Sequence, residues 1–372
     1  MTSTKVELLG DGHPRLLDPS AALPDPTAVR TSPRFLGIES LRGLAALAIV
    51  AQHARGSVLS TGRANDFLSE LAYGVSVFFV ISGFVLYRPH VARRLLGREP
   101  VDAARFVRRR VARIVPAYLA MLAAAAAIVP GPGWPGLGGW RYLVFGQTFS
   151  WHDHQQSIEA GIGQTWSVAI EIWFYVGLAA LFAIWAIRRM DRRAEATLLG
   201  AAVAMTVAFL LPHFAHAGVV SEVWLPSLAA FLCGMALATA NAHDSAWLRG
   251  IVARPGLLLT AALVALVAGG LRPAYYSLAG VAFAVAVVTL GIGARPADRT
   301  RLLLDPRLIL IGTISYGIYL WHEPLLFSLR GGDSAAHGPS AFAETGVALI
   351  LTGAIASLSW RFLEQPILRR VR

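Results

Sequence analysis

The sequence is poor in two residues that many proteins use freely, cysteine and lysine. Its 372 residues include one cysteine, Cys233, and one lysine, Lys5. A single cysteine excludes an intrachain disulfide, and its apolar surroundings favour a packed thiol over a nucleophile that carries an acyl group. The first 35 residues also lack an apolar core segment, so we expect no signal peptide.

Long apolar runs take up much of the chain. Hydrophobic residues make up 55% of it, and a soluble protein of this length is rarely so apolar. Several runs reach the roughly 20 residues that a helix needs to span a bilayer. The strands of a membrane barrel would alternate with a period of two, and these runs do not. The sequence therefore predicts an all-α, multi-pass (polytopic) protein of the cell membrane.

The apolar runs and the arginines predict the topology. About ten transmembrane helices are expected, near residues 36–54, 73–88, 113–130, 165–187, 197–213, 223–241, 256–271, 276–293, 308–327 and 342–360. With the N-terminus inside, 27 of the 33 basic residues fall on the inner side and 5 on the outer side. Because cytoplasmic loops are rich in basic residues, both termini are predicted to be cytoplasmic. The net charge of +11 thus reflects topology, and no nucleic acid partner is expected.

This layout divides the chain into three segments. Residues 1–34 are expected to be a disordered cytoplasmic tail, 35–366 a ten-helix membrane core, and 367–372 a basic cytoplasmic tail. The longest outer loop, 131–164, is rich in tryptophan and contains the run His152-Asp153-His154. We interpret this loop as an interfacial aromatic belt or a substrate lid. The run lacks the helical spacing of metal ligands, so no metal site is predicted.

Two ionisable residues share one face of the first predicted helix. Arg42 and His53 are eleven residues apart, which places them within about 20° of each other and roughly 16 Å apart along the axis. Ionisable residues inside a membrane usually serve function, and imidazole is the usual general base near neutral pH. The alternatives are an interfacial anchor for Arg42, paired with Glu39, and an interhelical hydrogen bond for His53.

A pair of arginines marks the predicted inner end of the third span. Arg110 and Arg113 are three residues apart and therefore share a helix face. Guanidinium groups bind phosphate oxygens through two hydrogen bonds, so the pair suits a phosphate or pyrophosphate. The alternative is a topology determinant that also binds anionic lipid.

A lone carboxylate lies in the fourth predicted span. Glu171 has Ser167 one turn before it and Tyr175 one turn after it, so the three side chains form one stripe. A buried carboxylate protonates or finds a cation, and the candidate cations are His53, Arg42 and the arginine pair.

The ninth predicted span carries a polar group of its own. Tyr316 and Tyr319 share a face, and His322 lies near the outer end. These residues line an acceptor site or anchor the helix at the interface. In the second span, Ser82-Gly83 indicates a close contact between helices.

Together these motifs resemble integral-membrane acyltransferase family 3, across nearly all of residues 35–366. The first-span pattern of an arginine and a histidine eleven residues later matches Arg42 and His53, although Glu39 stands where the family usually has aspartate. Further family motifs match Phe78 to Phe84, Arg110 to Tyr118, Trp166 to Tyr175 and Ser315 to His322. Members often add an extracytoplasmic hydrolase-like domain, and this chain is expected to be a stand-alone core.

The resemblance implies an O-acyltransferase that moves an acyl group from cytoplasmic acyl-CoA, such as acetyl-CoA or another short acyl-CoA, to an acceptor hydroxyl. It implies catalytic roles for His53, Arg42 and Glu171, with His53 as general base or, less favoured, as a transient acyl carrier. The residues implied in binding the CoA co-substrate are Arg110, Arg113 and Tyr118. Those implied in binding the acceptor are Ser167, Tyr175, Tyr316, Tyr319 and His322.

Two other classes of protein compete with an acyltransferase. A proton-coupled transporter or lipid flippase would also use membrane arginines, a buried glutamate and a histidine, but the short interrupted helices of carriers are not evident. A nonenzymatic scaffold leaves Arg42, His53 and Glu171 unexplained. The acceptor is expected to be a hydroxyl-bearing cell-surface glycan or an antibiotic such as a macrolide.

Overall fold

The computed structural model describes most of the chain. The described stretches are 6–8, 14–16, 35–58, 69–129, 139–149, 161–187, 223–296, 299–331 and 339–371, with a few single positions between 196 and 208. Residues Met1–Arg30 and Thr31–Arg372 are two compact units. In the first, β1 (Val6–Leu8) pairs antiparallel with β2 (Pro14–Leu16). The rest of the predicted 1–34 tail lies outside the described residues.

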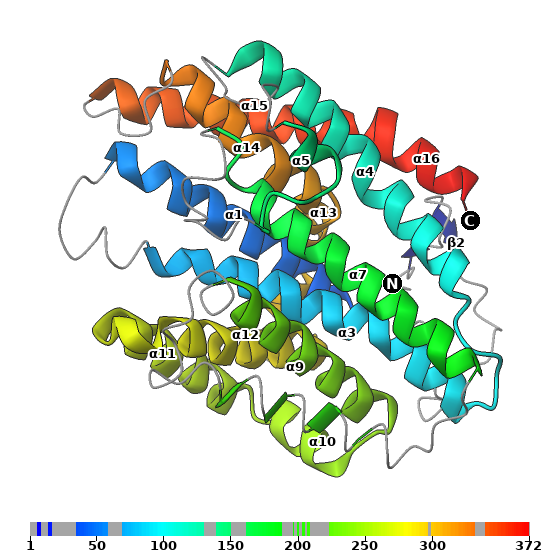
Figure 1. Cartoon of the computed structure of the whole chain (residues 1–372). Helices are drawn as coiled ribbons and strands as arrows, with labels where there is room; N and C mark the ends of the chain where they lie inside the picture. Colours follow the sequence, from blue (N-terminus) through cyan, green and yellow to red (C-terminus); the bar gives the residue numbers. More distant parts are fainter. Residues whose placement is uncertain are drawn as a thin grey trace. The chain divides into compact units, whose positions relative to one another are not determined.

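Every described element of the second unit is a helix, as Figure 1 shows. The longer helices are α1 (Leu36–Val58), α3 (Tyr73–Leu95), α4 (Ala103–Ile128), α7 (Thr165–Ile187), α9 (Leu225–Ala242), α11 (Pro255–Leu271), α12 (Tyr276–Ile292), α14 (Ser315–Leu329) and α15 (Pro339–Ser359). The shorter helices are η1 (Glu70–Ala72), α5 (Trp140–Leu143), α10 (Ala246–Val252), η4 (Pro273–Tyr275), η5 (Arg299–Leu304), α13 (Pro306–Thr313), the π-helix η6 (Trp360–Glu364) and α16 (Gln365–Arg370).

Helix α1 lies in the middle of the bundle. It packs against α3 and α12 on one side and against α13, α14 and α15 on the other, an arrangement visible in Figure 1. The residues that face these neighbours are buried, among them Ile38, Ala46 and Ile49. The helix that carries Arg42 and His53 is therefore surrounded by other helices along its length.

Nine of the ten predicted spans coincide with helices, and the remaining one, 197–213, lies mostly outside the described residues. The predicted 165–187 matches α7 at both ends. Helix α4 begins at Ala103 rather than near residue 113, because the Asp102 side chain accepts hydrogen bonds from the Ala104 and Arg105 amides and caps it. Arg110 and Arg113 therefore lie inside the helix, on one face, as predicted.

One predicted span is not a continuous helix, and another follows a sharp bend. The prediction of one helix over 308–327 was wrong, because α13 ends at Thr313 and α14 begins at Ser315. The break follows a tight crossing in which a Cβ on Gly43 of α1 would lie 2.9 Å from the Gly312 amide nitrogen. The span predicted near 256–271 is preceded by α10, which is bent by 81° from α11.

The described helices fit a multi-pass membrane protein. Five of them, counted with the helical turns that continue them, are long and apolar enough to cross a membrane, and α10 with α11 would make a sixth. Helix α12 is apolar but shorter. Helix α1 is not in this set even though it is long enough, and the polar Glu39, Arg42 and His53 that it carries lower its hydropathy. The count of ten spans and the cytoplasmic termini stay predictions.

The close contact predicted at Ser82-Gly83 is present between α3 and α9. A Cβ on Gly83 would run into the Phe231 carbonyl oxygen, and a Cβ on Gly234 would run into the Val80 carbonyl oxygen. The two backbones approach this closely because both positions lack a side chain, which is how small residues join helices in membranes.

We expect Gly83→Ala to lower the melting temperature of the detergent-solubilised protein. Overpacking a tight contact typically costs about 1–3 kcal/mol. Gly177→Ala, in α7, is the matched control because no atom lies within 4 Å of the added Cβ. Thermal unfolding of both variants tests the contact, and equal melting temperatures would contradict it.

Candidate active site

A cavity of about 100 Å³ opens among α1, α3, α4, α7 and α14. At about 10–15 Å³ per water, this volume holds several waters or a slender chain. All the predicted site residues line it except His53, Tyr118 and His322. The polar lining residues are Arg42, Ser82, Arg110, Arg113, Ser167, Glu171, Tyr175, Tyr316 and Tyr319. Residues that are far apart in the sequence therefore meet in one place.

Three arginines give the cavity a cationic wall. Arg113 forms an ion pair with Glu364 at 3.9 Å, and its guanidinium lies 4.9 Å from the centroid of the Trp360 ring. Arg42 pairs at 3.8 Å with Glu39, one turn earlier on α1, as predicted. The buried Nε of Arg110 has no hydrogen-bond partner among the described residues. Donor groups of these arginines are therefore available to an anion.

Glu171 finds hydroxyl partners. Its Oε1 accepts hydrogen bonds from Ser82 Oγ at 2.8 Å and from Tyr175 Oη at 2.5 Å. The sequence pointed to His53 or an arginine as the partner. The structure shows no ion pair to Glu171 among the described residues, although Arg42 and Arg110 line the same cavity. Ser82, predicted only as part of a helix contact, thus belongs to the polar lining.

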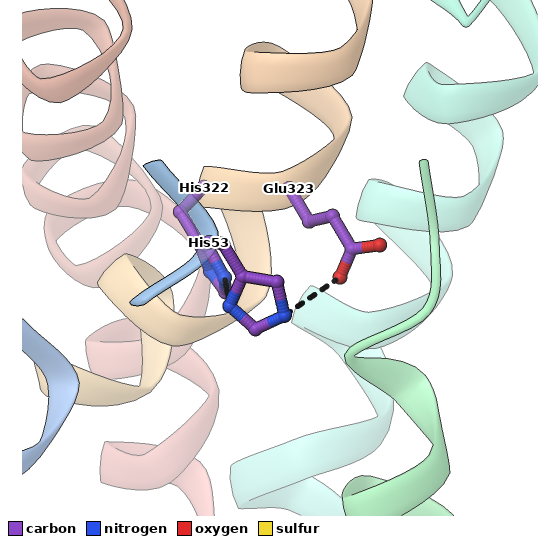
Figure 2. Close-up of side chains that lie close together, drawn as sticks. All are labelled: His53, His322 and Glu323. Carbon is purple, nitrogen blue, oxygen red and sulfur yellow. Dashed lines mark hydrogen bonds and ion pairs between the residues drawn. The ribbon is translucent and has the colours of Figure 1, made fainter. Parts of the chain in front are cut away.

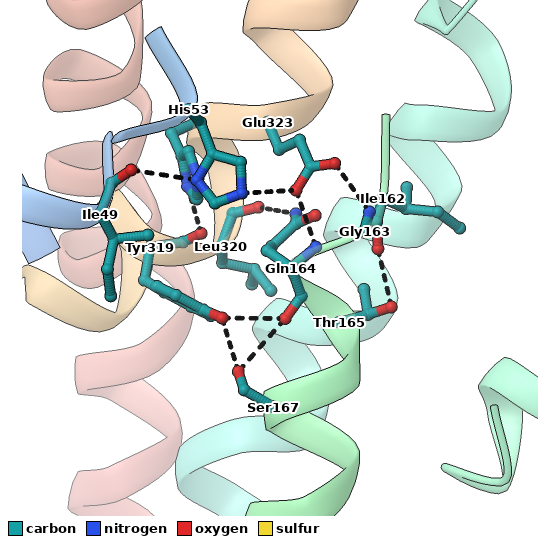
Figure 3. A network of polar contacts seen from close by, with 11 residues as sticks. Ile49, His53, Ile162, Gly163, Gln164, Thr165, Ser167, Tyr319, Leu320 and Glu323 are labelled. Carbon is teal, nitrogen blue, oxygen red and sulfur yellow. Dashed lines mark hydrogen bonds and ion pairs between the residues drawn. The ribbon is translucent and has the colours of Figure 1, made fainter. Parts of the chain in front are cut away.

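Ser167 and Tyr319 form the opposite end of the lining. Their hydroxyls are 2.5 Å apart, and both lie within hydrogen-bond distance of the Gln164 carbonyl oxygen, at 3.2 and 3.0 Å (Figure 3). Because each hydroxyl has one proton, one of them donates to the other, and the second donates to the carbonyl oxygen. The backbone of Tyr319 continues the network, because its carbonyl oxygen lies 2.6 Å from His322 Nδ1. One residue therefore joins the cavity to the histidines.

His53, His322 and Glu323 form a compact cluster next to that end, shown in Figure 2. His53 Nδ1 is 3.0 Å from the Ile49 carbonyl oxygen and 3.3 Å from His322 Nε2. His53 Nε2 is 3.8 Å from Glu323 Oε2. The His53 side chain is 35% exposed, whereas His322 is fully buried. His53 is therefore the more accessible histidine of the pair.

The sequence interpretation missed Glu323. Its Oε1 accepts from the Gly163 amide at 2.9 Å and its Oε2 from the Gln164 amide at 2.7 Å, just before α7 begins. The Gln164 side chain donates to the Leu320 carbonyl oxygen at 2.7 Å and ties this segment to α14 (Figure 3). A carboxylate directly after His322 in an apolar span was the signal that could have identified it.

Two tyrosines that were predicted to bind substrate donate hydrogen bonds from their hydroxyl groups to backbone carbonyl oxygens. Tyr118 Oη donates to the Tyr142 carbonyl oxygen at 3.1 Å and accepts from Gln147, and the residue does not line the cavity. Tyr316 lines the cavity, but its hydroxyl donates to the Ile114 carbonyl oxygen at 2.9 Å. These contacts hold α4 to its neighbours. The Tyr118 hydroxyl does not face the cavity in which CoA binding was expected.

The cluster also has the donor types of a metal site. The ligand atoms of His53, His322 and Glu323 all lie within 4.8 Å of one another, and two histidines with a glutamate are a known zinc set. The run His152-Asp153-His154 lies outside the described residues. The absence of a metal stays a prediction.

Several known proteins are similar in sequence to this chain. OatA of Staphylococcus aureus, an O-acetyltransferase, is 24% identical over 91% of this chain, and the match covers 58% of OatA. ExoZ of Rhizobium meliloti, an exopolysaccharide production protein, is 29% identical over 81% of the chain and 90% of ExoZ. BcsY of Komagataeibacter xylinus, a putative membrane-bound transacylase, is 27% identical over 77% of the chain and 72% of BcsY. No solved structure matches.

The family comparison covers most of the helical unit that holds the site. The acyltransferase 3 family, described as an acyltransferase domain, matches residues 35–361. That range includes every residue of the cavity lining and of the histidine cluster. The chain therefore belongs to the acyltransferase 3 family.

Proposed function

We propose that the protein transfers a short acyl group, such as acetyl, from acyl-CoA to a hydroxyl of an acceptor, with His53 as general base. One observation carries the proposal: a single cavity joins three arginines to Ser167 and Tyr319, which adjoin the histidine cluster. Two of the relatives are named for O-acetyl transfer and for exopolysaccharide production, which supports the proposal.

The arginine wall is the proposed site for the phosphates of CoA. Guanidinium groups pair with phosphate oxygens through charge-assisted hydrogen bonds. Arg42 and His53 are separated by roughly 16 Å along α1, so a donor held at the arginines must extend a long arm toward the histidine. The narrow cavity suits the pantetheine chain, which is extended and uncharged. Arg42 and Glu171 would orient that chain.

The transfer step follows from the position of His53. The acceptor hydroxyl gives its proton to His53 Nε2 as its oxygen attacks the thioester carbonyl carbon. The bond between that carbon and sulfur then breaks, and the leaving thiolate takes the proton back from His53. The products are an O-acyl ester and free CoA, and the base is regenerated. His53 has the exposure that this role needs.

The two substrates are proposed to arrive from different ends of the bundle. The distribution of arginines predicts that Arg110 and Arg113 lie on the cytoplasmic side, where acyl-CoA is made. His53 lies far along α1 from that side, so the acceptor would reach it from the outer half of the membrane or sideways from the lipid. A glycan needs the outer route, whereas an apolar antibiotic such as a macrolide could use the lateral one.

We expect His53→Ala to abolish acyl transfer while the protein still inserts and folds. Loss of a general base typically lowers the rate by about 10²–10⁴-fold. The assay follows label from radioactive acetyl-CoA into a panel of oligosaccharides and macrolides, using purified protein. Wild-type transfer by His53→Ala protein would rule out this mechanism, and an unchanged melting temperature is the control for folding.

Arg110→Ala and Arg113→Ala are each expected to weaken CoA binding. A hydrogen bond to a charged group is worth about 1.5–3 kcal/mol, which corresponds to a loss of roughly 10- to 150-fold in affinity. Arg109→Ala is the matched control, because Arg109 is an exposed residue of the same helix outside the cavity. Calorimetry with CoA measures the change. Unchanged affinity in the Arg110/Arg113 double variant would leave these arginines as topology determinants only.

A further inference from the structure

The contacts of His53 fix which of its nitrogens can act as a base. A carbonyl oxygen only accepts hydrogen bonds, so His322 Nδ1 carries the proton that faces the Tyr319 carbonyl oxygen. His53 Nδ1 likewise carries a proton, because it faces the Ile49 carbonyl oxygen. The same N–H points at His322 Nε2, which accepts from it at 3.3 Å. His53 Nε2 is left with a free lone pair.

Glu323 faces that free nitrogen from a fixed position. Both of its oxygens accept backbone hydrogen bonds, from Gly163 and from Gln164. Its Oε2 lies 3.8 Å from His53 Nε2, which is too long for a hydrogen bond and short enough for an ion pair. A carboxylate at this distance stabilises the ring once it takes a proton, and it leaves room for a hydroxyl to approach Nε2.

Gly163 keeps Glu323 in this place. A Cβ on Gly163 would lie 2.6 Å from Glu323 Oε1, so a side chain there would push the carboxylate away. The atom nearest to a Cβ added at Gly163 is Glu323 Oε1, at the flexible end of that side chain. The glycine therefore offers a way to move the carboxylate without removing its charge.

We propose that Glu323 is a positioning residue for the reaction: fixed by the amides of Gly163 and Gln164, its carboxylate orients the His53 ring and stabilises the cation that forms when Nε2 accepts the acceptor's proton. Buried His322 holds the opposite side of the ring. This inference rests on the proposed role of His53. It gives His322 a place behind the base instead of the acceptor-binding role expected from the sequence.

A metal ion is the competing occupant of the cluster. A metal bound to His322 Nε2 would need the lone pair that already accepts from His53 Nδ1 at 3.3 Å. The carboxylate oxygens of Glu323 are likewise held by two amides. These hydrogen bonds favour a proton-transfer arrangement over a metal centre.

The experiment compares Glu323→Gln, Glu323→Asp and Gly163→Ala with the wild type, using acetyl-CoA and the acceptor found by the panel. We expect Glu323→Gln and Gly163→Ala to lower kcat by about 10- to 100-fold, part of the 10²–10⁴ that a general base contributes. The KM for acetyl-CoA should not change, since the donor is held at the arginines. Glu323→Asp keeps the charge and should recover part of the lost rate. Gly177→Ala, in open space on α7, should have wild-type kcat.

The outcomes separate this inference from the proposed function. An inactive His53→Ala protein together with wild-type kcat in Glu323→Gln would overturn the role of Glu323 and leave His53 as the base. Wild-type transfer by His53→Ala would overturn both. Metal analysis of the purified wild type is the last measurement. Stoichiometric zinc whose removal abolishes activity would replace the positioning role with a metal centre.

Discussion

The site depends on how closely α1 can approach its neighbours. Both residues that first indicated function, Arg42 and His53, lie on this one helix. A Cβ on Gly43 would lie 2.9 Å from the backbone of α13, and a Cβ on Gly74 of α3 would lie 2.8 Å from the Ala45 carbonyl oxygen. These glycines let α1 pack tightly on both sides, which is the usual way that membrane helices associate. The tight packing fixes the register of α1, and so it sets where the arginine and the histidine meet residues of α4, α7 and α14.

Three of the carboxylates in the described helices, Glu171, Glu323 and Glu364, are each stabilised differently. Glu171 accepts from two hydroxyls, Glu323 from two backbone amides, and Glu364 pairs with Arg113 and accepts from Ser359. An unpaired charge in a membrane is costly, so each of these partners is part of the stability of the bundle. The differences matter for chemistry as well. Glu323 is held by two backbone amides, which carry no charge to gain or lose, and this suits a carboxylate placed beside a base.

The sequence predicted much of the candidate site because ionisable and polar residues in a membrane span stand out against an apolar background. Arg42, Glu171 and the arginine pair were conspicuous for this reason, and the cavity gathers all of them. Helix periodicity also placed Ser167, Glu171 and Tyr175 on one stripe. The hydrogen bond from Tyr175 to Glu171 confirms this for two of them, and all three line the cavity. The residues that contact these predicted side chains were harder to predict. Ser82 and Glu364 come from other helices, and Glu323 is held by a turn of the chain, so only the packing of the bundle reveals them.

The hydrogen bond between the Ser167 and Tyr319 hydroxyls has a consequence for selectivity. An enzyme that activates a hydroxyl beside a thioester must keep water from being that hydroxyl, since hydrolysis would waste the donor. Both hydroxyls are engaged with each other and with the Gln164 carbonyl oxygen, at the end of the cavity nearest His53. Hydrogen bonds of this kind would close the cavity on the side that faces the histidines until a substrate displaces them. The thioester would meet an activated oxygen only when an acceptor large enough to displace these contacts is in place, which favours transfer over hydrolysis.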